Sequence, residues 1–457
     1  MQDYRTERDS MGEVQVPADA LFGAQTQRAV HNFSISSLAM PPAFIRALGV
    51  IKKAAAEANM ELGLLGREEG RAIAAAAQEI RDGRHLAHFP VSVFQTGSAT
   101  STHMNINEVI VGLAGRRGVT LSANDQVNMG QSSNDVIPTA LYVAAALGIK
   151  EEVMPAVAHL AKIIRDRARE YGHVIKTGRT HLMDALPIRM AAELEAWAAG
   201  LDECLERFSS VLPRLQRLPL GGTAVGSGVN CHPDFPARAG RLIKEMTGLE
   251  CTVAANFYKG LSLLDTVVEA SGHLRAAAVV LMKISNDLRW MNSGPGAGLG
   301  EIALPALQPG SSIMPAKVNP VIPEAVLMAC AQIMGNDQVI ALAGQGGTFQ
   351  LNTMLPVAAH NLIQAMELLS NSARDLADKA VAGMTVNEEV CGAFVRRNPI
   401  LVTALNAKIG YMAAAEIAKQ AMAEKRPILE VALEKSGLSR EELEALLDPA
   451  RLADGNA

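Results

Sequence analysis

The sequence predicts an all-α protein, elongated and oligomeric, and two patterns carry this prediction. Long segments repeat apolar residues in alternating steps of three and four, which is the spacing of a buried helix face. Period-two alternation of β-branched and aromatic residues is scarce, so no βαβ pattern supports a doubly wound sheet. Predicted helices of about 25–30 residues exceed the globular mean of roughly 11–12 and are typical of a long bundle.

Two apolar seams define the longest predicted helices. The first joins Leu194, Trp197, Leu201, Cys204, Phe208, Val211, Leu215 and Leu218. The second joins Val267, Ala270, Leu274, Ala277, Leu281, Ile284, Leu288 and Met291. Pro213 should kink the first of these helices near its end. Because one chain carries so many seams, we expect other copies of the chain to bury some of these faces.

The remaining elements follow from weaker patterns. Alanine-rich stretches at residues 139–174, 321–344 and 355–381 are helical by propensity. Strands are expected only near residues 13–16 and 119–121. We therefore divide the chain into an N-terminal mixed helical domain (1–130), a central long-helix bundle (131–355) and a small C-terminal helical domain (356–457).

Composition narrows the function classes. With 49% hydrophobic and 19% charged residues, the 457-residue chain fits a globular protein and not a disordered one. A net charge of −5 and 4% aromatics offer no basic face for nucleic acid. No window approaches the roughly 18 uninterrupted apolar residues of a membrane span, and the first residues lack the apolar core of a secretory signal. We expect a cytoplasmic protein with neither nucleic-acid nor membrane partners.

The cysteines predict neither disulfides nor a metal site. Their number is odd, none forms a CxxC pair, and they are Cys204, Cys231, Cys251, Cys330 and Cys391. Zinc and iron–sulfur sites usually draw at least two ligands from one short segment. No such segment is present, so we predict no metal.

Four polar clusters interrupt the helical patterns and are the candidates for chemistry. They lie at residues 95–108, 131–135, 177–181 and 310–320, and they supply hydroxyls, amides and cations suited to a carboxylate or an oxyanion. Any one of them could merely cap a helix. Four in one chain, with His181 and Lys317 among them, favour a binding site. The glycine-rich stretches at 221–228 and 294–300 match no nucleotide-binding spacing, and we interpret them as tight connections.

The fourth cluster, GSSIMPAKVNP, resembles the GSSxMPxKxNP signature of the fumarase/aspartase superfamily. Segments along essentially the whole chain also resemble class II fumarases, namely RTERDSMGEVQVPADALFGAQTQRA, FQTGSATST, SSND, GRTHLMDA, GGTAVGSG, NDLRWMNSGP and LVTALNAKIGY. The resemblance implies a three-domain fold whose central helices form a homotetramer core, with each active site shared between three chains. It also implies reversible anti addition of water to fumarate, giving (S)-malate, without a cofactor and as a step of the tricarboxylic acid cycle.

The resemblance assigns the catalytic roles as well. Ser311 is the implied base, His181 the implied acid, and Glu324 the carboxylate that orients the histidine. A serine hydroxyl is a weak base near neutral pH, so we expect backbone N–H groups at the Gly310 turn and the Lys317 ammonium to stabilise its alkoxide. The positions implied to hold the two substrate carboxylates are Ser98, Thr100, Ser132, Ser133, Asn134, Thr180, Ser312, Lys317 and Asn319.

Some residues depart from the family pattern. Ala99 and Ala316 stand where glycine is usual, and His103 stands where asparagine is usual. We interpret His103 as a tolerated neighbour of the site and not as a second catalytic histidine. The family's second carboxylate site reads His-Pro-Asn-Asp, whereas this chain has Ser122, Ala123, Asn124 and Asp125. Ser122, Asn124 and Asp125 are therefore candidates for a second site whose occupancy stays open.

Two alternatives accompany the hydratase interpretation. Aspartate ammonia-lyase shares the fold and the base, and Ala316 together with Pro187–Ile188–Arg189 is similar to aspartases. The segments SSND, TGSAT, GRTHLMDA and LRW favour the hydratase. A bundle that has lost catalysis, as some lens crystallins of this superfamily resemble, is disfavoured because Ser311, His181, Lys317 and Asn319 are intact.

Overall fold

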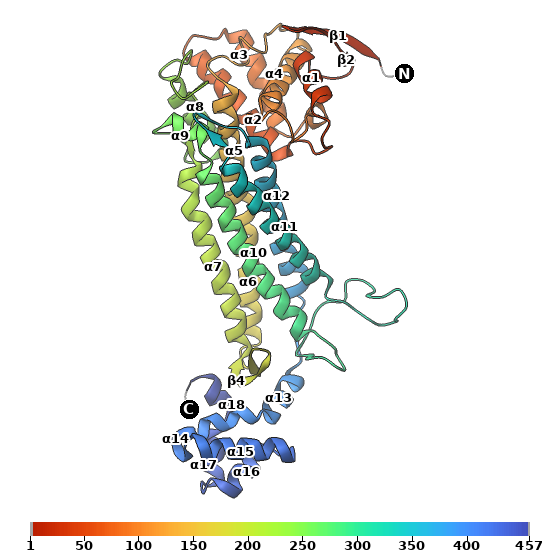
Figure 1. Cartoon of the computed structure of the whole chain (residues 1–457), viewed down its shortest axis with the longest axis vertical. Coiled ribbons are helices and arrows are strands. Elements are labelled where there is room, and N and C mark those ends of the chain that lie inside the picture. Colours follow the sequence, from red (N-terminus) through yellow and green to blue (C-terminus); the bar gives the residue numbers. More distant parts are fainter. Residues whose placement is uncertain (1–2, 456–457) are drawn as a thin grey trace. The chain divides into compact units, whose positions relative to one another are not determined.

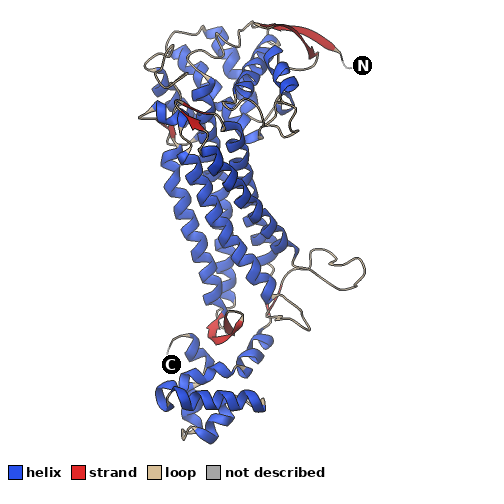
Figure 2. Ribbon diagram, viewed as in Figure 1, coloured by secondary structure: helices blue, strands red, loops and turns tan. Residues whose placement is uncertain are grey.

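A computed structural model describes residues 3–455, and Figure 2 shows that helices dominate it, with only short strands. The chain divides into two compact units. The first comprises the described residues up to Pro155 together with Cys204–Ala278 and Ala329–Ser370. The second comprises Ala156–Glu203, Val279–Met328 and the described residues from Asn371 onward. Several long helices contribute residues to both units.

The first unit contains the N-terminal hairpin and the helices that follow it (Figure 1). Its complete elements are β1 (Tyr4–Asp9), β2 (Gly12–Pro17), α1 (Ala24–Asn32), α2 (Pro42–Glu61), α3 (Arg67–Arg81), the 3₁₀ turn Leu86–His88, α4 (Thr100–Gly115), α5 (Ser133–Leu147), the π-helical turn Gly148–Val153, β5 (Arg217–Leu218), α8 (Phe235–Thr247), β6 (Thr252–Val253), α9 (Phe257–Ser262), β8 (Gly347–Thr348) and β9 (Leu351–Asn352). β1 pairs antiparallel with β2, β8 pairs antiparallel with β9, and β5 pairs parallel with β6.

Helix α2 carries much of the core of the first unit. It begins with Pro42, a residue that suits the first turn because its missing N–H has no helical partner there. Phe44, Leu48 and Ile51 are fully buried, and the helix packs against α3, α5 and α8. Lys52 on the same helix is also fully buried, which places an amine inside the core of the first unit.

The second unit contains the hairpin after α6, the loop before α11 and the C-terminal helices. Its complete elements are β3 (Ile175–Thr180), β4 (Met183–Arg189), β7 (Ile302–Ala303), the π-helical turn Leu376–Val381, β10 (Thr385–Val386), α13 (Glu388–Arg397), the 3₁₀ helix Pro399–Leu405, α14 (Asn406–Ile409), α15 (Tyr411–Glu424), α16 (Ile428–Lys435), α17 (Arg440–Leu446) and α18 (Pro449–Ala453). β3 pairs antiparallel with β4, and β7 pairs antiparallel with β10.

The helices with residues in both units are α6 (Met154–Glu170), α7 (Met190–Leu215), α10 (Asp265–Met291), α11 (Val321–Gly344) and α12 (Leu355–Asp375). Both predicted seams are buried, because every residue of each is no more than 3% exposed. The first seam is helical only to Leu215, since Leu218 lies in β5. Helices α7 and α10 contact each other within each unit. Arg214 pairs with Glu269 in the first, and the Lys283 ammonium lies 5.8 Å from the Trp197 ring centroid in the second. These pairs make the two helices antiparallel neighbours.

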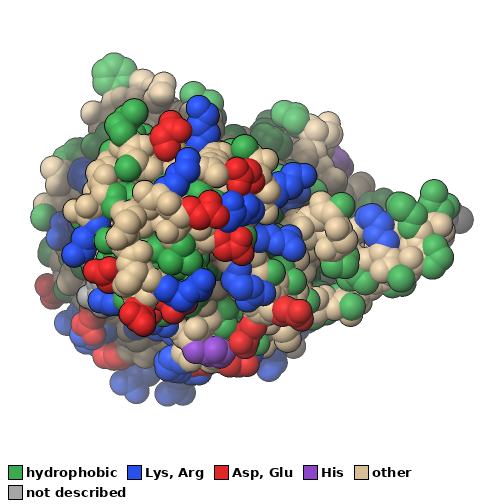
Figure 3. All heavy atoms as spheres, turned by 90° about the horizontal axis from the view of Figure 1, so that it is seen from below, with side chains coloured by type: hydrophobic (Ala, Val, Ile, Leu, Met, Phe, Trp, Pro, Cys, Tyr) green, Lys and Arg blue, Asp and Glu red, His purple; other side chains and the backbone are tan. Residues whose placement is uncertain are grey.

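The C-terminal helices have a small core of their own. It includes Leu405, Ile417, Val431 and Leu443. The charged stretch at 424–444 lies on the surface, where Arg426 pairs with three glutamates. Figure 3 shows Lys/Arg and Asp/Glu side chains interspersed on the face that it presents. The ion pairs of Arg426 thus place charges of both signs side by side in this stretch.

The shorter elements meet the expectations unevenly. The strand expected near 13–16 is β2, and the helices expected at 139–174, 321–344 and 355–381 are present, the first and the last with a π-helical turn. The strand expected at 119–121 is wrong, because within residues 3–455 no segment pairs with it. α7 ends at Leu215, two residues after Pro213. The three-domain division by residue ranges stays a prediction.

Within the described chain, one helix is long and apolar enough to cross a membrane by length and composition alone. This helix is α11, whose most apolar 18-residue window has a mean hydropathy of 1.3 and is 33% buried. Asp337 interrupts its apolar sequence and accepts hydrogen bonds from Ser271 and Arg275 of α10, each at 2.7 Å. Such contacts are those of a helix packed within a protein bundle.

Candidate active site

The first polar cluster forms a tight turn before α4. Gly97 packs on the loop before α12 so closely that a Cβ would lie 1.8 Å from the carbonyl oxygen of Thr353. Ala99 has a left-handed backbone, with φ 55°, which is the physical reason that glycine suits this position. The turn brings the Ser98 and Thr100 hydroxyl oxygens to 2.9 Å from each other, with Thr100 exposed.

The second cluster begins α5. The Ser132 hydroxyl accepts from the Asn134 N–H at 3.3 Å, and the Asp135 carboxylate accepts from the Ser132 N–H at 2.9 Å. This reciprocal pair is a capping box. Ser133 follows, with its Oγ 2.9 Å from Nδ1 of His103. The capping role that was the simple explanation for this cluster is therefore real, but it leaves Ser133 and the Asn134 side chain for other partners.

Asp135 also joins α5 to the glycine-rich stretch at 221–228. Its Oδ2 accepts from the N–H groups of Gly221 and Thr223, both at 2.9 Å. The side chain is fully buried, and burial raises its pKa to about 6 although these N–H bonds favour the ionised form. The Asn134 amide donates to the Ala224 carbonyl at 2.8 Å. The stretch is thus a tight connection held by a carboxylate.

His181, from the third cluster, lies at the tip of the β3–β4 hairpin. Thr180 pairs with Met183, so His181 and Leu182 are the two central residues of the turn. Their φ angles are 56° and 62°, the left-handed values of a type I′ turn, which glycine and asparagine usually occupy. His181 is exposed, and in the described part of the chain no residue is bonded to its ring. The turn therefore presents an imidazole to its surroundings.

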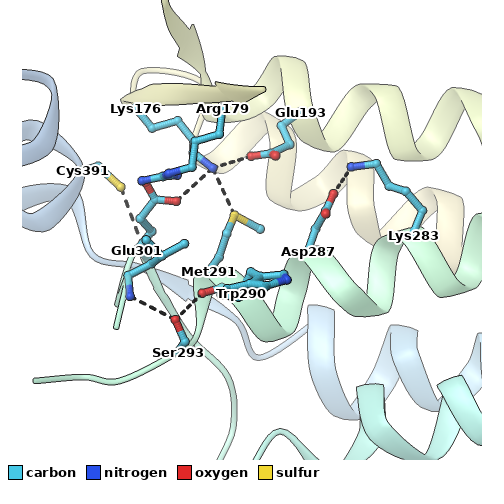
Figure 4. A network of polar contacts seen from close by, with 11 residues as sticks. Lys176, Arg179, Glu193, Lys283, Asp287, Trp290, Met291, Ser293, Glu301 and Cys391 are labelled. Atoms are coloured by element: carbon cyan, nitrogen blue, oxygen red, sulfur yellow. Dashed lines mark hydrogen bonds and ion pairs between the residues drawn. The ribbon is translucent and has the colours of Figure 1, made fainter. Parts of the chain in front are cut away.

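A buried charge cluster anchors this hairpin (Figure 4). The Lys176 ammonium lies 2.6 Å from the Glu193 carboxylate and 3.0 Å from that of Glu301, and the Arg179 guanidinium lies 2.9 Å from the other Glu301 oxygen. The Glu301 side chain is fully buried. Two cations and two carboxylates balance, which offsets part of the cost of burying them. The cluster ties the hairpin to β7, which precedes the Ser311 loop.

The fourth cluster forms a loop that is closed at its base. The Gly310 N–H donates to the Lys317 carbonyl at 2.7 Å, and the Asn319 amide donates to the Gly310 carbonyl at 2.8 Å. A Cβ at Gly310 would lie 2.4 Å from the Lys317 carbonyl oxygen, so this closure requires glycine. Ala316 has φ 65°, which again explains why glycine is usual there. The Lys317 ammonium donates to Asn319 Oδ1.

The Ser311 hydroxyl oxygen is a hydrogen-bond acceptor within this loop. It accepts from the Met314 N–H at 3.0 Å and from the Ile313 N–H at 3.3 Å. Donors aimed at an oxygen stabilise negative charge on it. The N–H of Gly310 itself is not one of these donors, because it is used by the Lys317 carbonyl. The donors come instead from the two residues that follow Ser312.

Two hollows of the second unit flank Lys317. One, of about 480 Å³, is also lined by Ser311, and the other, of about 960 Å³, is lined by Asn319 and Glu324. Glu324 lies in the first turn of α11 and is exposed. Within residues 3–455, no side chain is bonded to its carboxylate. Both hollows exceed what a four-carbon dicarboxylate needs.

The structure places the predicted residues in two groups. The first unit holds Ser98, Thr100, Ser132, Ser133 and Asn134, and the second holds Thr180, His181, Ser311, Ser312, Lys317, Asn319 and Glu324. In the described chain, no hydrogen bond joins the imidazole of His181 to Ser311 or Glu324. The implied acid, base and orienting carboxylate are therefore not assembled by one chain through direct bonds.

The candidate second carboxylate site is a local turn in the first unit. The Ser122 hydroxyl accepts from the Asp125 N–H at 3.2 Å, and the Ser122 N–H donates to Gln126 at 2.8 Å. The Asn124 and Asp125 side chains are exposed. The hydroxyl that replaces the family's histidine thus supports the turn, and ligand binding at this site stays a prediction.

Sequence reasoning missed several residues that support the site. Asp135 carried a signal, since an acid three residues after Ser132 completes a capping box. Glu301 and Lys176 carried none, because the charge cluster depends on segments that are distant in the sequence. In the described residues, no group of three His, Cys, Asp or Glu side chains could hold a metal, and all five cysteines are free.

Comparison with known families covers most of the chain. Residues 12–335 match the family described as lyase, and residues 401–454 match the family described as fumarase C C-terminus. Fumarate hydratase class II 2 of Pseudomonas aeruginosa is 55% identical over 456 residues, with 100% of both chains covered. Fumarate hydratase class II of Xylella fastidiosa is 54% identical over 454 residues, covering 99% of this chain and 96% of the relative.

Solved structures give the same result. The class II fumarase from Schistosoma mansoni has a TM-score of 0.95 and 36% identity, with 100% of both chains covered. The fumarate lyase:delta crystallin from Brucella melitensis, in its cobalt-bound structure, has a TM-score of 0.93 and 43% identity over 99% of this chain and 100% of that one. The predicted all-α fumarase/aspartase fold is confirmed, and the fumarate hydratase relatives do not favour the ammonia-lyase alternative. The chain belongs to the class II fumarate hydratase family.

Proposed function

We infer that the protein catalyses the reversible anti addition of water to fumarate, giving (S)-malate. The observation that carries this proposal is the Ser311 hydroxyl, which accepts two backbone N–H groups in the loop that Lys317 closes. An oxygen with two such donors is suited to carry the negative charge of a catalytic base. The names of relatives at 46–55% identity over nearly the whole chain support the same activity.

The proposed reaction assigns a role to each group. In the dehydration direction, the Ser311 alkoxide removes the C3 proton of malate, and the electron pair moves into the adjacent carboxylate. Lys317 and Asn319 stabilise that charge. The C2–O bond then breaks while the C2–C3 double bond forms, and His181, oriented by Glu324, protonates the leaving hydroxide to water. Ser98, Thr100, Ser132, Ser133, Asn134, Thr180 and Ser312 hold the two carboxylates.

A homotetramer with shared active sites is part of this proposal. Apolar side chains on the long helices are exposed in one chain, among them Val279 at 53%, Met328 at 69% and Leu342 at 57%. Such surfaces on adjacent long helices fit burial by further copies of the chain. His181 and Glu324 have no side-chain partner within the described chain, which fits a site that other copies complete. We place the enzyme in the cytoplasm and in the tricarboxylic acid cycle.

An ultraviolet assay of fumarate tests the function directly. The purified protein should form fumarate from (S)-malate and show little or no deamination of aspartate under matched conditions. Faster turnover of aspartate than of malate would make it an ammonia-lyase. Dialysis against a chelator should leave the activity unchanged, and a loss that iron restores would contradict the metal-free mechanism.

A further inference from the structure

Three polar side chains in contact with one another form a row from the interior of the first unit to the start of α5. The Lys52 ammonium of α2 lies 2.7 Å from Nε2 of His103 on α4, and Nδ1 of His103 lies 2.9 Å from the Ser133 hydroxyl oxygen. Lys52 is 0% and His103 is 1% exposed, whereas Ser133 is half-buried. Of these three side chains, only Ser133 has a role in the proposed reaction.

Counting donors and acceptors fixes the direction of these hydrogen bonds. A lysine ammonium has three donors and no acceptor, and Lys52 also donates to the Gln131 side-chain oxygen at 2.9 Å. Nε2 of His103 must therefore accept from Lys52. A neutral imidazole carries its single hydrogen on the other nitrogen, so Nδ1 donates to the Ser133 oxygen.

The consequence concerns the single hydrogen of the Ser133 hydroxyl. Burial and the charge of Lys52 hold the pKa of His103 well below its ordinary value, so the ring is neutral. The Ser133 oxygen then accepts from His103, and its own hydrogen is available to another acceptor. With the opposite tautomer, Ser133 would donate inward and present only lone pairs, which repel a carboxylate.

The charged groups around Lys52 decide when this arrangement holds. Asp135 on α5 favours the charged amine, whereas burial lowers the pKa of Lys52 to about 7. Within the described chain, no charge on α3 or α8, which also pack against α2, acts on it. Cys231, near Asp135, stays neutral because burial raises its pKa to about 12. Lys52 therefore changes its charge near neutral pH, where Asp135 is largely ionised.

We propose that Lys52 and His103 are positioning residues that fix the Ser133 hydroxyl as a donor to a carboxylate of the bound four-carbon dicarboxylate. This inference rests on the proposed function, because it assumes that Ser133 meets substrate. Loss of the Lys52 proton gives the amine a lone pair that accepts from Nε2–H. The Nε2–H tautomer of His103 then gains an acceptor, and in that tautomer Ser133 turns its hydrogen inward to Nδ1. The enzyme would lose affinity for dicarboxylate as Lys52 deprotonates.

Nuclear magnetic resonance of ¹⁵N-histidine-labelled protein tests the tautomer without substrate. We expect His103 to be the Nδ1–H tautomer at about pH 6, with its signals assigned by their absence in His103→Asn. In Lys52→Met the Nε2–H tautomer should appear, because methionine donates nothing to Nε2. A wild-type His103 in the Nε2–H form at that pH would overturn the proposal, whatever reaction the protein catalyses and however Lys52→Met folds.

Calorimetric titration with succinate, an unreactive dicarboxylate, tests the consequence for binding. Lys52→Met should weaken succinate binding about tenfold, the worth of one hydrogen bond to a charged group. The control is Lys53→Met, because Lys53 donates to Gln78 at 2.8 Å and not to His103. With malate as substrate, the loss should appear mainly in KM. Unchanged affinity in Lys52→Met would overturn the proposal.

We call the contacts from Lys52 through His103 to Ser133 the relay. A double variant distinguishes the relay from a general effect of Lys52 on succinate binding. In His103→Asn, the ring that connects Lys52 to Ser133 is absent, so adding Lys52→Met should cost no further affinity. A further tenfold loss would show that Lys52 acts by another route and would overturn the relay. Absence of malate turnover in the wild type would instead refute the proposed function, while the tautomer measurement would still decide the relay.

Discussion

The two groups of candidate site residues differ in how their side chains are held. In the first unit, Ser133 rests on His103 and Lys52, which are almost completely buried. In the second unit, His181 lies exposed at the tip of a hairpin, and Ser311 lies in a loop whose other side chains are mostly exposed. The comparison indicates that the first unit supplies binding groups preorganised by its own core. The second holds the proposed acid and base on exposed turns, where our proposal has another copy of the chain complete the site.

The support beneath each group also differs. Asp135 fixes the first group by accepting three backbone N–H groups from two segments. The second group depends on ion pairs at the base of its hairpin, centred on Lys176 and Glu301. These pairs involve the base of the hairpin and not its exposed tip. Substitutions at the tip should therefore affect catalysis, and substitutions at the base should affect stability.

The largest expected effect is on catalysis at the exposed tips. Ser311→Ala and His181→Asn should each lower kcat by roughly 10²–10⁴, the usual contribution of a general acid or base. Because neither side chain is buried, the circular dichroism spectrum and thermal midpoint should stay close to those of the wild type. A Ser311→Ala enzyme with nearly normal kcat would show that another group is the base.

The next effect is on stability at the base of the hairpin. Glu301→Gln leaves the buried Lys176 without a charged partner on one side, and breaking such a pair usually costs about 3–5 kcal/mol. The control is Asp454→Asn, which removes an exposed ion pair with Arg189 that should contribute only about 0–1 kcal/mol. Urea denaturation midpoints measure both. Equal shifts for the two variants would mean that burial does not distinguish the two ion pairs.

A smaller effect concerns the pH dependence of the first unit. The folded pKa of Asp135 is about 6, above the ordinary 3.8, so folding favours its protonated form. The preference for protonated Asp135 adds at most roughly 3 kcal/mol to the free energy of unfolding below about pH 4, and this contribution is lost as the pH rises through about 6. Asp135→Asn should lack this slope. Parallel stability curves for the two proteins between these pH values would contradict the assignment.

The smallest effect is expected at the hairpin turn. Leu182→Gly relieves a left-handed backbone that costs about 1–2 kcal/mol for a residue with a Cβ, while the flexibility of glycine costs about 0.5–1 kcal/mol. We expect a net gain in unfolding free energy of up to about 1 kcal/mol. Leu186→Gly in β4, also an exposed leucine on this hairpin, should lose stability instead. Changes of the same sign would argue against strain at the turn.

Sequence reasoning predicted the helices better than the supports of the site. The seams from Leu194 and from Val267 were visible because helix periodicity leaves a regular apolar pattern. The relay was not visible, because Lys52 lies 51 residues from His103 and His103 lies 30 residues from Ser133. Leu182 gave no sign of its left-handed backbone, since leucine is not a turn residue. The polar clusters were visible as interruptions of the helical patterns, and motif resemblance assigned roles to their residues, but only geometry showed which N–H groups reach Ser311.

The central claim, a site shared between chains, is tested most directly by hybrid tetramers. Ser311→Ala and His181→Asn chains, carrying different affinity tags, are co-expressed or unfolded and refolded together, and the hybrids are purified through both tags. Each parent should be nearly inactive, whereas the hybrids should regain malate turnover because some sites combine an intact His181 from one chain with an intact Ser311 from another. Differently tagged Ser311→Ala chains mixed alone provide the control and should stay inactive. If verified hybrids are as inactive as their parents, the two residues act from the same chain and the shared-site account fails.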